Sequence, residues 1–254
     1  MPPTLTDLGL PRTPVIIGHR GACGHAPENT LASFSLAVEQ LADMIELDLH
    51  LTRDGNLIAS HDCDLTRTAG VQLSVEESEY DALRTINVAS YFGADYPHTT
   101  MPLLDELLEA IPVHVPINLE LKSRNADRGR YVDVLERKLV RDRVLISSFD
   151  WTLLEEVHRR LPHIPIAPIA DQNAPQLPDV TRRLHATSAH CNWRTITREI
   201  VGELHEMNVP VMVYTVNDVA VAEEMLAMGV RGVFTNFPGD FVSHFRLPPS
   251  RAAW

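Results

Sequence analysis

The stretch VIIGHRGACGHAPENT, residues 15–30, joins a short β-branched run to a glycine-rich turn. Its first three residues have the composition of a buried strand, and an apolar stripe at helical spacing starts directly after the stretch. Asn29 or Thr30 is expected to cap that helix. His19 and Arg20 therefore stand where a strand ends and before a helix begins, a position typical of an active-site edge.

The same change from a strand pattern to a helix pattern recurs along the chain. Eight strands are predicted at residues 15–18, 44–51, 113–121, 144–148, 164–169, 186–191, 209–216 and 232–235. Helices are predicted between them at residues 30–41, 105–110, 131–140, 151–161, 197–207 and 219–228. Such alternation implies parallel strands joined by right-handed crossovers.

These elements predict an α/β fold, a (β/α)₈ TIM barrel formed by a single catalytic domain over residues 1–254. The length suits eight strand–helix units, and the active sites of such barrels gather at the carboxyl ends of the strands. A doubly wound sheet would also alternate and is the competing architecture. Residues 61–102 contain few periodic segments, so we expect a small insertion after the second strand, lying over the barrel mouth.

The composition argues against several classes of protein. A formal net charge of −12 disfavours a nucleic-acid surface, which needs clustered lysine and arginine. The three cysteines are widely spaced, so neither a disulfide framework nor a zinc ribbon is expected. Residues 1–14 lack the charged and apolar regions of a secretion signal, and no later apolar run reaches membrane-spanning length. We therefore expect a cytoplasmic protein with no stable membrane association.

The second predicted strand carries two carboxylates on one face. In IELDLH, residues 45–50, the two-residue period of a strand directs Glu46, Asp48 and His50 to one side. Two like charges that face a barrel interior are costly to bury unless they share a proton or bind a cation. A divalent ion is the simpler explanation.

The next predicted strand adds a third carboxylate. In NLELK, residues 118–122, Asn118, Glu120 and Lys122 share a face. Glu120 would complete an all-oxygen site with the two preceding carboxylates, which suits Mg²⁺ or Ca²⁺ better than zinc. Salt bridges inside the barrel, such as Glu120 with Lys122 or Arg20, are the alternative interpretation.

Two histidines end apolar segments and are expected at the same mouth of the barrel. His19 follows the first strand, and His61 ends the run NLIASH, residues 56–61. Two imidazoles beside a metal-bound phosphate are suited to act as general base and general acid. Arg20 and Lys122 are suited to hold the anionic oxygens of that phosphate. Their alternative role is to pair with the carboxylates.

Several short motifs recur in a fixed order. They are HRG at 19–21, PENT at 27–30, ELD at 46–48, HD at 61–62 and ELK at 120–122, joined by RT at 67–68, MPLLDE at 101–106, SSFD at 147–150 and YTVN at 214–217. In this order and spacing the set resembles the glycerophosphodiester phosphodiesterase family, from about residue 15 to residue 238. The whole set is far more specific than any one motif within it.

The resemblance implies a TIM barrel that hydrolyses glycerophosphodiesters to glycerol 3-phosphate and an alcohol. It implies one divalent cation as cofactor, Mg²⁺ or Ca²⁺ with Mn²⁺ as a further candidate, and a small-molecule glycerophosphodiester as partner, while homo-oligomerisation is left open. The implied site comprises the metal ligands Glu46, Asp48 and Glu120, the catalytic His19 and His61, the phosphate-binding Arg20 and Lys122, and the substrate-binding Phe149 and Tyr214.

Two positions depart from the family pattern. Tyr214 stands where the family usually has tryptophan, and Asn236 stands where it typically has aspartate. Tyr214 retains an aromatic wall and, with Phe149 and Trp193, is expected either to line the substrate site or to pack within the barrel. Asn236 is expected to alter a hydrogen bond around the site more than the chemistry itself.

The reaction is left open in two respects. The nucleophile is either water or the neighbouring glycerol hydroxyl, which would give a cyclic phosphate, and the sequence does not fix which histidine is the base. The resemblance favours the hydroxyl route and favours His61 as the acid on the leaving group. A lysophospholipase D-like activity and a non-catalytic phosphodiester-binding barrel are the competing functions.

Overall fold

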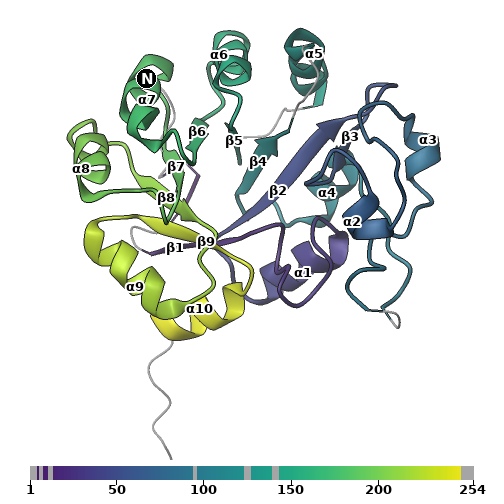
Figure 1. The fold of residues 1–254 in the computed structure, drawn as a ribbon, viewed down its shortest axis with the longest axis horizontal. Helices are drawn as coiled ribbons and strands as arrows, with labels where there is room; N and C mark the ends of the chain where they lie inside the picture. The colour runs from purple at the N-terminus through teal and green to yellow at the C-terminus, as the bar shows by residue number, and fades with distance from the viewer. Residues whose placement is uncertain are drawn as a thin grey trace, which may run out of the picture.

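The computed structural model describes residue 5 and residues 8–10, 14–93, 96–122, 127–138 and 143–246. Eight parallel strands of this part of the chain close into a barrel, which confirms the predicted TIM barrel over the doubly wound sheet (Figure 1). They are β1 (Val15–Gly18), β2 (Met44–Leu51), β4 (Ile117–Leu121), β5 (Val144–Ser148), β6 (Ile166–Ala170), β7 (Ala189–Asn192), β8 (Val211–Tyr214) and β9 (Gly232–Thr235). β1 pairs with both β2 and β9, and these pairings close the ring.

Helices surround the barrel (Figure 1). They are α1 (Leu31–Glu39), α4 (Leu104–Ala110), α5 (Arg128–Lys138), α6 (Trp151–Arg160), α7 (Leu177–Leu184), α8 (Arg198–Glu206), α9 (Val219–Met228) and α10 (Pro238–Arg246), with a 3₁₀ turn, η1 (Ala174–Gln176), before α7. Thr30 caps α1, because its side-chain oxygen accepts the backbone N–H of Ser33. Among the described helices none is long and apolar enough to cross a membrane.

Sequence patterns did not predict α7 or α10. In α7 the apolar residues Leu177, Val180 and Leu184 are buried at helical spacing, but the helix has only eight residues and carries proline in its first turn. α10 begins at Pro238, which is tolerated there because its missing N–H would have no partner within the helix. Short helices that contain proline give weak periodic signals, and for this reason both were missed.

Several predicted boundaries differ from the structure by one to four residues, and the beginnings of β4 and α5 are two of them. The strand predicted over residues 113–121 is wrong in its first half, where Val113 is 77% exposed. The buried Arg143 guanidinium donates to the carbonyl of Val115 and to those of Ile111 and Pro112 just before it, and so holds the chain ahead of β4 as a turn. The helix predicted over residues 131–140 starts one turn earlier, and residues 139–140 lie outside the described part of the chain.

The segment between β2 and α4 leaves the barrel. It begins with β3 (Leu57–Ala59), which runs antiparallel to β2 and was not predicted as a strand. Two short helices follow, α2 (Thr66–Ala69) and α3 (Tyr80–Leu83), at the right of Figure 1. A separate apolar cluster forms around Leu65. This excursion occupies the part of the chain where the insertion over residues 61–102 was expected.

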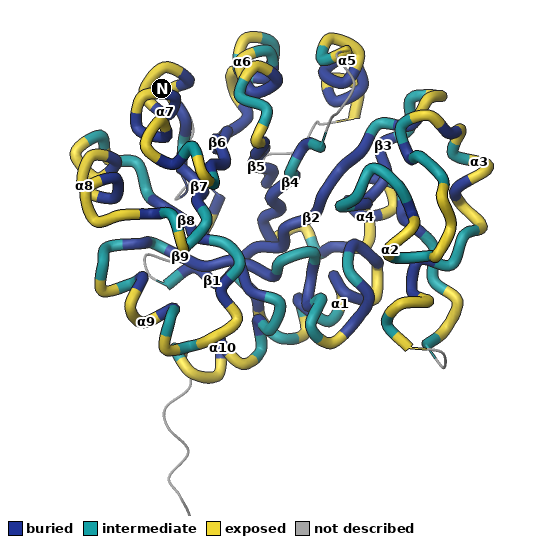
Figure 2. Tube along the Cα trace, viewed as in Figure 1, coloured by how far each residue is buried: buried dark blue, intermediate teal, exposed yellow. Residues whose placement is uncertain are grey.

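The apolar core has two main parts. The larger cluster lies between the outward faces of the strands and the surrounding helices, whose solvent-facing sides are exposed (Figure 2). A second cluster fills the amino-terminal end of the barrel interior, where Ile17, Met44 and Met212 meet Leu5 and Leu8 of the amino-terminal segment. Because this end is packed with apolar side chains, the polar residues of the interior lie toward the carboxyl ends of the strands.

Candidate active site

Three carboxylates converge at the carboxyl ends of β2 and β4. Asp48 pairs in register with Glu120 across these strands, and Glu46 lies two residues before Asp48 on β2. One oxygen from each of the three residues lies within 4.8 Å of the others. Glu46 and Asp48 are each 1% exposed. The two-residue period of neighbouring strands thus produces the cluster that the sequence suggested.

Asp48 is surrounded by hydrogen-bond donors and positive charges. Arg20 Nε lies 3.4 Å from Asp48 Oδ2, and Lys122 Nζ lies 3.1 Å from Asp48 Oδ1. Asn29 donates from Nδ2 to Asp48 Oδ2 at 2.8 Å and accepts the Asp48 backbone N–H at 3.1 Å. Burial by itself opposes ionisation, but Lys122 and Arg20 hold the pKa of Asp48 well below its usual range. Asn29 therefore orients a carboxylate, while Thr30 alone caps the helix.

Glu46 and Glu120 are less fully compensated. The Arg20 backbone N–H donates to Glu46 Oε2 at 2.7 Å, whereas Glu46 Oε1 is buried with no hydrogen-bond partner among the described residues. Burial raises the pKa of Glu46 well above its ordinary value, and the charges of Asp48 and Glu120 raise it further. Burial also raises the pKa of Glu120, although Lys122 opposes this. An orphaned carboxylate oxygen beside two more carboxylates fits a divalent cation, and oxygen-only donors favour Mg²⁺, Ca²⁺ or Mn²⁺.

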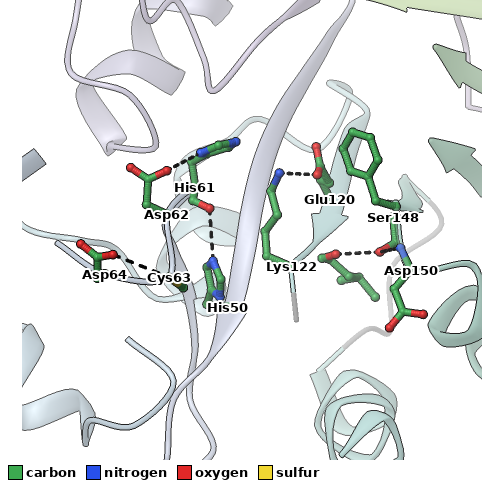
Figure 3. A pocket seen from close by; sticks show the side chains of 11 residues that line it. His50, His61, Asp62, Cys63, Asp64, Glu120, Lys122, Ser148 and Asp150 are labelled. Atoms are coloured by element: carbon green, nitrogen blue, oxygen red, sulfur yellow. Dashed lines mark hydrogen bonds and ion pairs between the residues drawn. The ribbon is translucent and has the colours of Figure 1, made fainter. Parts of the chain in front are cut away.

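The alternative of salt bridges inside the barrel is also realised in part. Lys122 pairs with Glu120 and with Asp48, and Figure 3 shows the Lys122 and Glu120 side chains directed at each other. Arg20 pairs with Asp48 and with Glu28. Arg20 and Lys122 therefore balance only part of the carboxylate charge, and the phosphate contacts expected of them stay predictions.

His19 directly follows β1 and is held by Asn236. The His19 backbone N–H donates to the Thr235 carbonyl at 2.9 Å, and the ring Nδ1 lies 2.7 Å from Asn236 Oδ1. Because an amide oxygen only accepts, Nδ1 carries the proton and Nε2 is the acceptor nitrogen. Burial lowers the pKa of His19 to about 4, and the Arg20 charge acts in the same direction. His19 is therefore a neutral imidazole with a free basic nitrogen.

His61 follows β3 and is held by a carboxylate instead. Its Nδ1 lies 2.8 Å from Asp62 Oδ1, which also directs Nε2 away from that carboxylate (Figure 3). Burial lowers the pKa of His61, whereas the charges of Asp48 and Asp62 oppose that effect. The two predicted catalytic histidines thus have different supports, an amide for His19 and a carboxylate for His61.

A cleft of about 350 Å³ opens beside the carboxylates (Figure 3). It is lined by His50, His61, Asp62, Cys63, Asp64, Glu120, Leu121, Lys122, Ser148, Phe149 and Asp150. A smaller space of about 30 Å³ adjoins it in the barrel and is lined by His19, Glu46, Asn118, Glu120, Phe149, Ile169, His190, Tyr214 and Phe234. Glu120 and Phe149 line both spaces, so His61 and His19 approach the carboxylates from two sides.

His50 holds the main chain of His61. The sequence placed His50 on the same face as the carboxylates of β2 but suggested no role for it. Its Nδ1 lies 2.9 Å from Glu76 Oε1. Its Nε2 lies 3.2 Å from the His61 carbonyl oxygen, a contact drawn in Figure 3. His50 thereby ties β2, the excursion and His61 together, and no local pattern signals either contact because both partners are distant in sequence.

Phe149 and Tyr214 lie together at the mouth of the barrel. Their ring centroids are 6.0 Å apart with an interplanar angle of 83°. Phe149 is 46% exposed, and Lys122 Nζ lies 5.7 Å from its ring centroid. The Tyr214 hydroxyl donates to the Ala170 carbonyl at 2.7 Å, so the ring rather than the hydroxyl faces the smaller space. Trp193 packs against the larger core cluster and is not among the residues that line either space.

Known proteins are similar to most of this chain in sequence and in fold. The sequence model of the glycerophosphoryl diester phosphodiesterase family matches residues 19–240. A glycerophosphodiester phosphodiesterase from Bacillus altitudinis is 34% identical over 232 residues, which cover 88% of this chain and 94% of that protein. The structure of an Oleispira antarctica phosphodiesterase in complex with the product sn-glycerol-3-phosphate has a TM-score of 0.85 and 28% identity, covering 92% of this chain and 96% of that one.

A more distant relative carries a different name. Human lysophospholipase D GDPD1 is 31% identical over 157 residues, which cover 59% of this chain and 50% of that protein. The family match, by contrast, spans every predicted site residue, from His19 near its start to Tyr214 near its end. On the strength of that match and of the full-length relative, the chain belongs to the glycerophosphoryl diester phosphodiesterase family.

Proposed function

We propose that the chain hydrolyses glycerophosphodiesters to glycerol 3-phosphate and an alcohol, with a divalent cation held by Glu46, Asp48 and Glu120. The observation that carries the proposal is the buried, unpartnered Glu46 Oε1 beside two further carboxylates, with a histidine on either side of them. The similarity to a phosphodiesterase in complex with sn-glycerol-3-phosphate supports the product.

The supports of the two histidines favour a division of roles. Asn236 is neutral and leaves His19 as an unprotonated imidazole, which is the form that a general base requires. Asp62 is a carboxylate and opposes the lowering of the His61 pKa by burial, so it favours the imidazolium form that a general acid requires more than a neutral partner would. His19 Nε2 would take the proton of the attacking hydroxyl, and His61 Nε2 would give a proton to the departing alkoxide.

The transition state gains negative charge on the phosphoryl oxygens. Arg20 and Lys122 lie beside the carboxylate cluster and would stabilise that charge through N–H donors. A cation held by Glu46, Asp48 and Glu120 would supply further positive charge to stabilise the same transition state. Phe149 and Tyr214 would bound the alcohol side of the substrate with their rings. The nucleophile is the neighbouring glycerol hydroxyl in the route that the family resemblance favours, followed by hydrolysis of the cyclic phosphate.

The test is release of glycerol 3-phosphate from a panel of glycerophosphodiesters, with the chelated protein reloaded with Mg²⁺, Ca²⁺ or Mn²⁺. His19→Ala and His61→Ala should each lower kcat by about 10²–10⁴-fold, because each removes a proton-transfer group. His25→Ala is the matched control, since His25 is an exposed histidine whose ring contacts Phe237. Near-normal turnover by purified His19→Ala would refute the assignment, and absence of metal-dependent turnover across the panel would favour a binding barrel.

Lysophospholipase D activity is the second candidate, because the relative of that name covers more than half of this chain. Lysophosphatidylcholine should therefore be assayed beside glycerophosphocholine. We expect the glycerophosphodiester to be the better substrate, since the cleft is lined mostly by polar and charged side chains.

The three cysteines are unpaired, which supports the proposal of a reducing, cytoplasmic location.

A further inference from the structure

Arg67, on helix α2 of the excursion, bridges two carboxylates. Its Nη1 and Nη2 donate to Glu28 Oε2 and Oε1 at 2.8 and 2.6 Å, and its Nε donates to Asp62 Oδ2 at 2.6 Å. Neither the periodicity of the sequence nor the proposed chemistry assigns this residue a role. A guanidinium has the planar fork that such a three-bond bridge requires.

Each of the two carboxylates touches a residue of the proposed reaction. The second oxygen of Asp62 accepts from His61 Nδ1 at 2.8 Å. Glu28 Oε1 also accepts from Arg20 Nη1 at 2.9 Å, and Arg20 in turn lies against the carboxylate cluster. Arg67 is therefore the point at which the His61 side and the Arg20 side of the site are joined.

The surroundings of Arg67 argue against a direct contact between this residue and the substrate. Arg67 is not among the residues that line the cleft, and its Nε, Nη1 and Nη2 are all engaged with carboxylates. Its guanidinium carbon lies 5.8 Å from the centroid of the Tyr91 ring, and the Tyr91 hydroxyl accepts the Glu28 backbone N–H. The excursion thus supplies both the arginine and a ring that packs on it.

We propose that Arg67 is a positioning residue, which orients Asp62 so that His61 presents Nε2 to the leaving group, and which restrains Arg20 through Glu28. This inference rests on the proposed function for its catalytic consequence. His50 already holds the main chain of His61, so Arg67 acts on the direction and tautomer of the ring. A residue with this role affects turnover and leaves substrate binding nearly unchanged.

The first experiment compares Arg67→Gln and Arg67→Lys with the wild type. Arg67→Gln should lower kcat by about 10–100-fold, the usual effect of removing a group that orients a functional side chain, with KM changed by less than about twofold. Arg67→Lys should lose less, because one ammonium reaches one of the two carboxylates. Arg53→Gln is the control, since Arg53 is another arginine of the excursion that pairs with a carboxylate, Glu79 at 3.0 Å, and no described contact joins it to a residue of the candidate site.

A double-mutant cycle tests the path through Asp62. Asp62→Asn and Arg67→Gln should each lower kcat, and the double variant should be scarcely worse than the worse single variant, because both break one connection. Additive losses would overturn the proposal. A rise in KM with kcat unchanged would also overturn it, since that result would make Arg67 a substrate ligand.

A second readout does not need substrate. In ¹⁵N NMR spectra, assigned with His61→Gln, wild-type His61 should show protonated Nδ1, and Arg67→Gln should lower the population of that tautomer while Arg53→Gln leaves it unchanged. An unchanged tautomer in Arg67→Gln would overturn the inference. If the wild type has no glycerophosphodiesterase activity, the proposed function fails, and the tautomer measurement still decides the role of Arg67. If Arg67→Gln does not fold, Arg67→Lys carries both measurements.

Discussion

The hydrogen bond between His19 and Asn236 allows the proposed base to be tested by one substitution. Asn236→Asp places a carboxylate where an amide oxygen now lies, 2.7 Å from His19 Nδ1. An opposite charge at this distance raises the pKa of an imidazole by about 1–3, which corresponds to about 1.4–4 kcal/mol in favour of the imidazolium form. We therefore expect the pKa of His19 to rise from about 4 to about 5–7.

The sign of the effect on activity follows from the role of His19. A base works only when unprotonated, so raising its pKa moves the acid limb of the kcat/KM profile to higher pH. For a final pKa of about 6, the unprotonated fraction at about pH 5 falls from roughly 0.9 to 0.1, which predicts a tenfold loss of kcat/KM. At about pH 8 the variant should match the wild type. The assay is glycerol 3-phosphate release from about pH 4 to 9.

A matched variant separates the effect of a carboxylate beside His19 from the effect of one more negative charge on the protein. Asn192→Asp adds the same charge at the end of β7, where the Asn192 side chain accepts the Arg194 backbone N–H at 3.0 Å. Its acid limb should coincide with that of the wild type. If the limb of Asn236→Asp also coincides with the wild type, or moves to lower pH, His19 is not the group that titrates and the assignment of the base is wrong.

Three further predictions concern the metal, the barrel and the aromatic wall. Because the pKa of Glu46 is raised, binding of a divalent cation should expel the Glu46 proton, and the affinity for the cation should fall about tenfold per pH unit below that pKa. Calorimetry in two buffers of different ionisation enthalpy counts the released proton. Cation binding without proton release would contradict the proposed site. A Cβ at Gly232 would lie 2.5 Å from the Val15 carbonyl oxygen, so Gly232→Ala should lower the free energy of unfolding by about 1–3 kcal/mol. Gly202 faces open space on α8, so Gly202→Ala should raise the free energy of unfolding by about 0.5–1 kcal/mol. Urea denaturation measures both values, and equal effects of the two substitutions would refute the packing argument. Tyr214→Phe should cost about 0.5–1.5 kcal/mol of stability with kcat unchanged, and a large fall in kcat would give the hydroxyl a part in the reaction.

The carboxylate cluster of the site follows from the sequence because it depends on local rules. The two-residue period fixes the shared face of Glu46 and Asp48, and parallel pairing of adjacent strands brings Glu120 opposite Asp48. The alternation of strands and helices similarly predicts the barrel. Both inferences use information within a few residues of each side chain or the order of elements along the chain.

The supporting residues escape sequence analysis because their partners are distant. Asn29 precedes a helix and so suggests a cap, but its φ of 56°, which asparagine tolerates, belongs to a conformation that carries its side chain to Asp48. His50 and Arg67 contact Glu76 and Glu28, residues 26 and 39 positions away, respectively. These contacts depend on how the excursion folds back on the barrel, and no periodic pattern in the sequence predicts the course of the chain there.

The candidate site draws its residues from two parts of the chain, the barrel strands and the excursion that carries His61. The three clustered carboxylates belong to strands of the closed sheet, whereas His61, Asp62 and Arg67 all belong to the excursion between β2 and α4. The excursion carries its own apolar cluster, so its shape does not depend only on the sheet. Exchanging this segment between relatives should therefore replace His61, Asp62 and Arg67 together, while the carboxylate cluster of β2 and β4 stays in place.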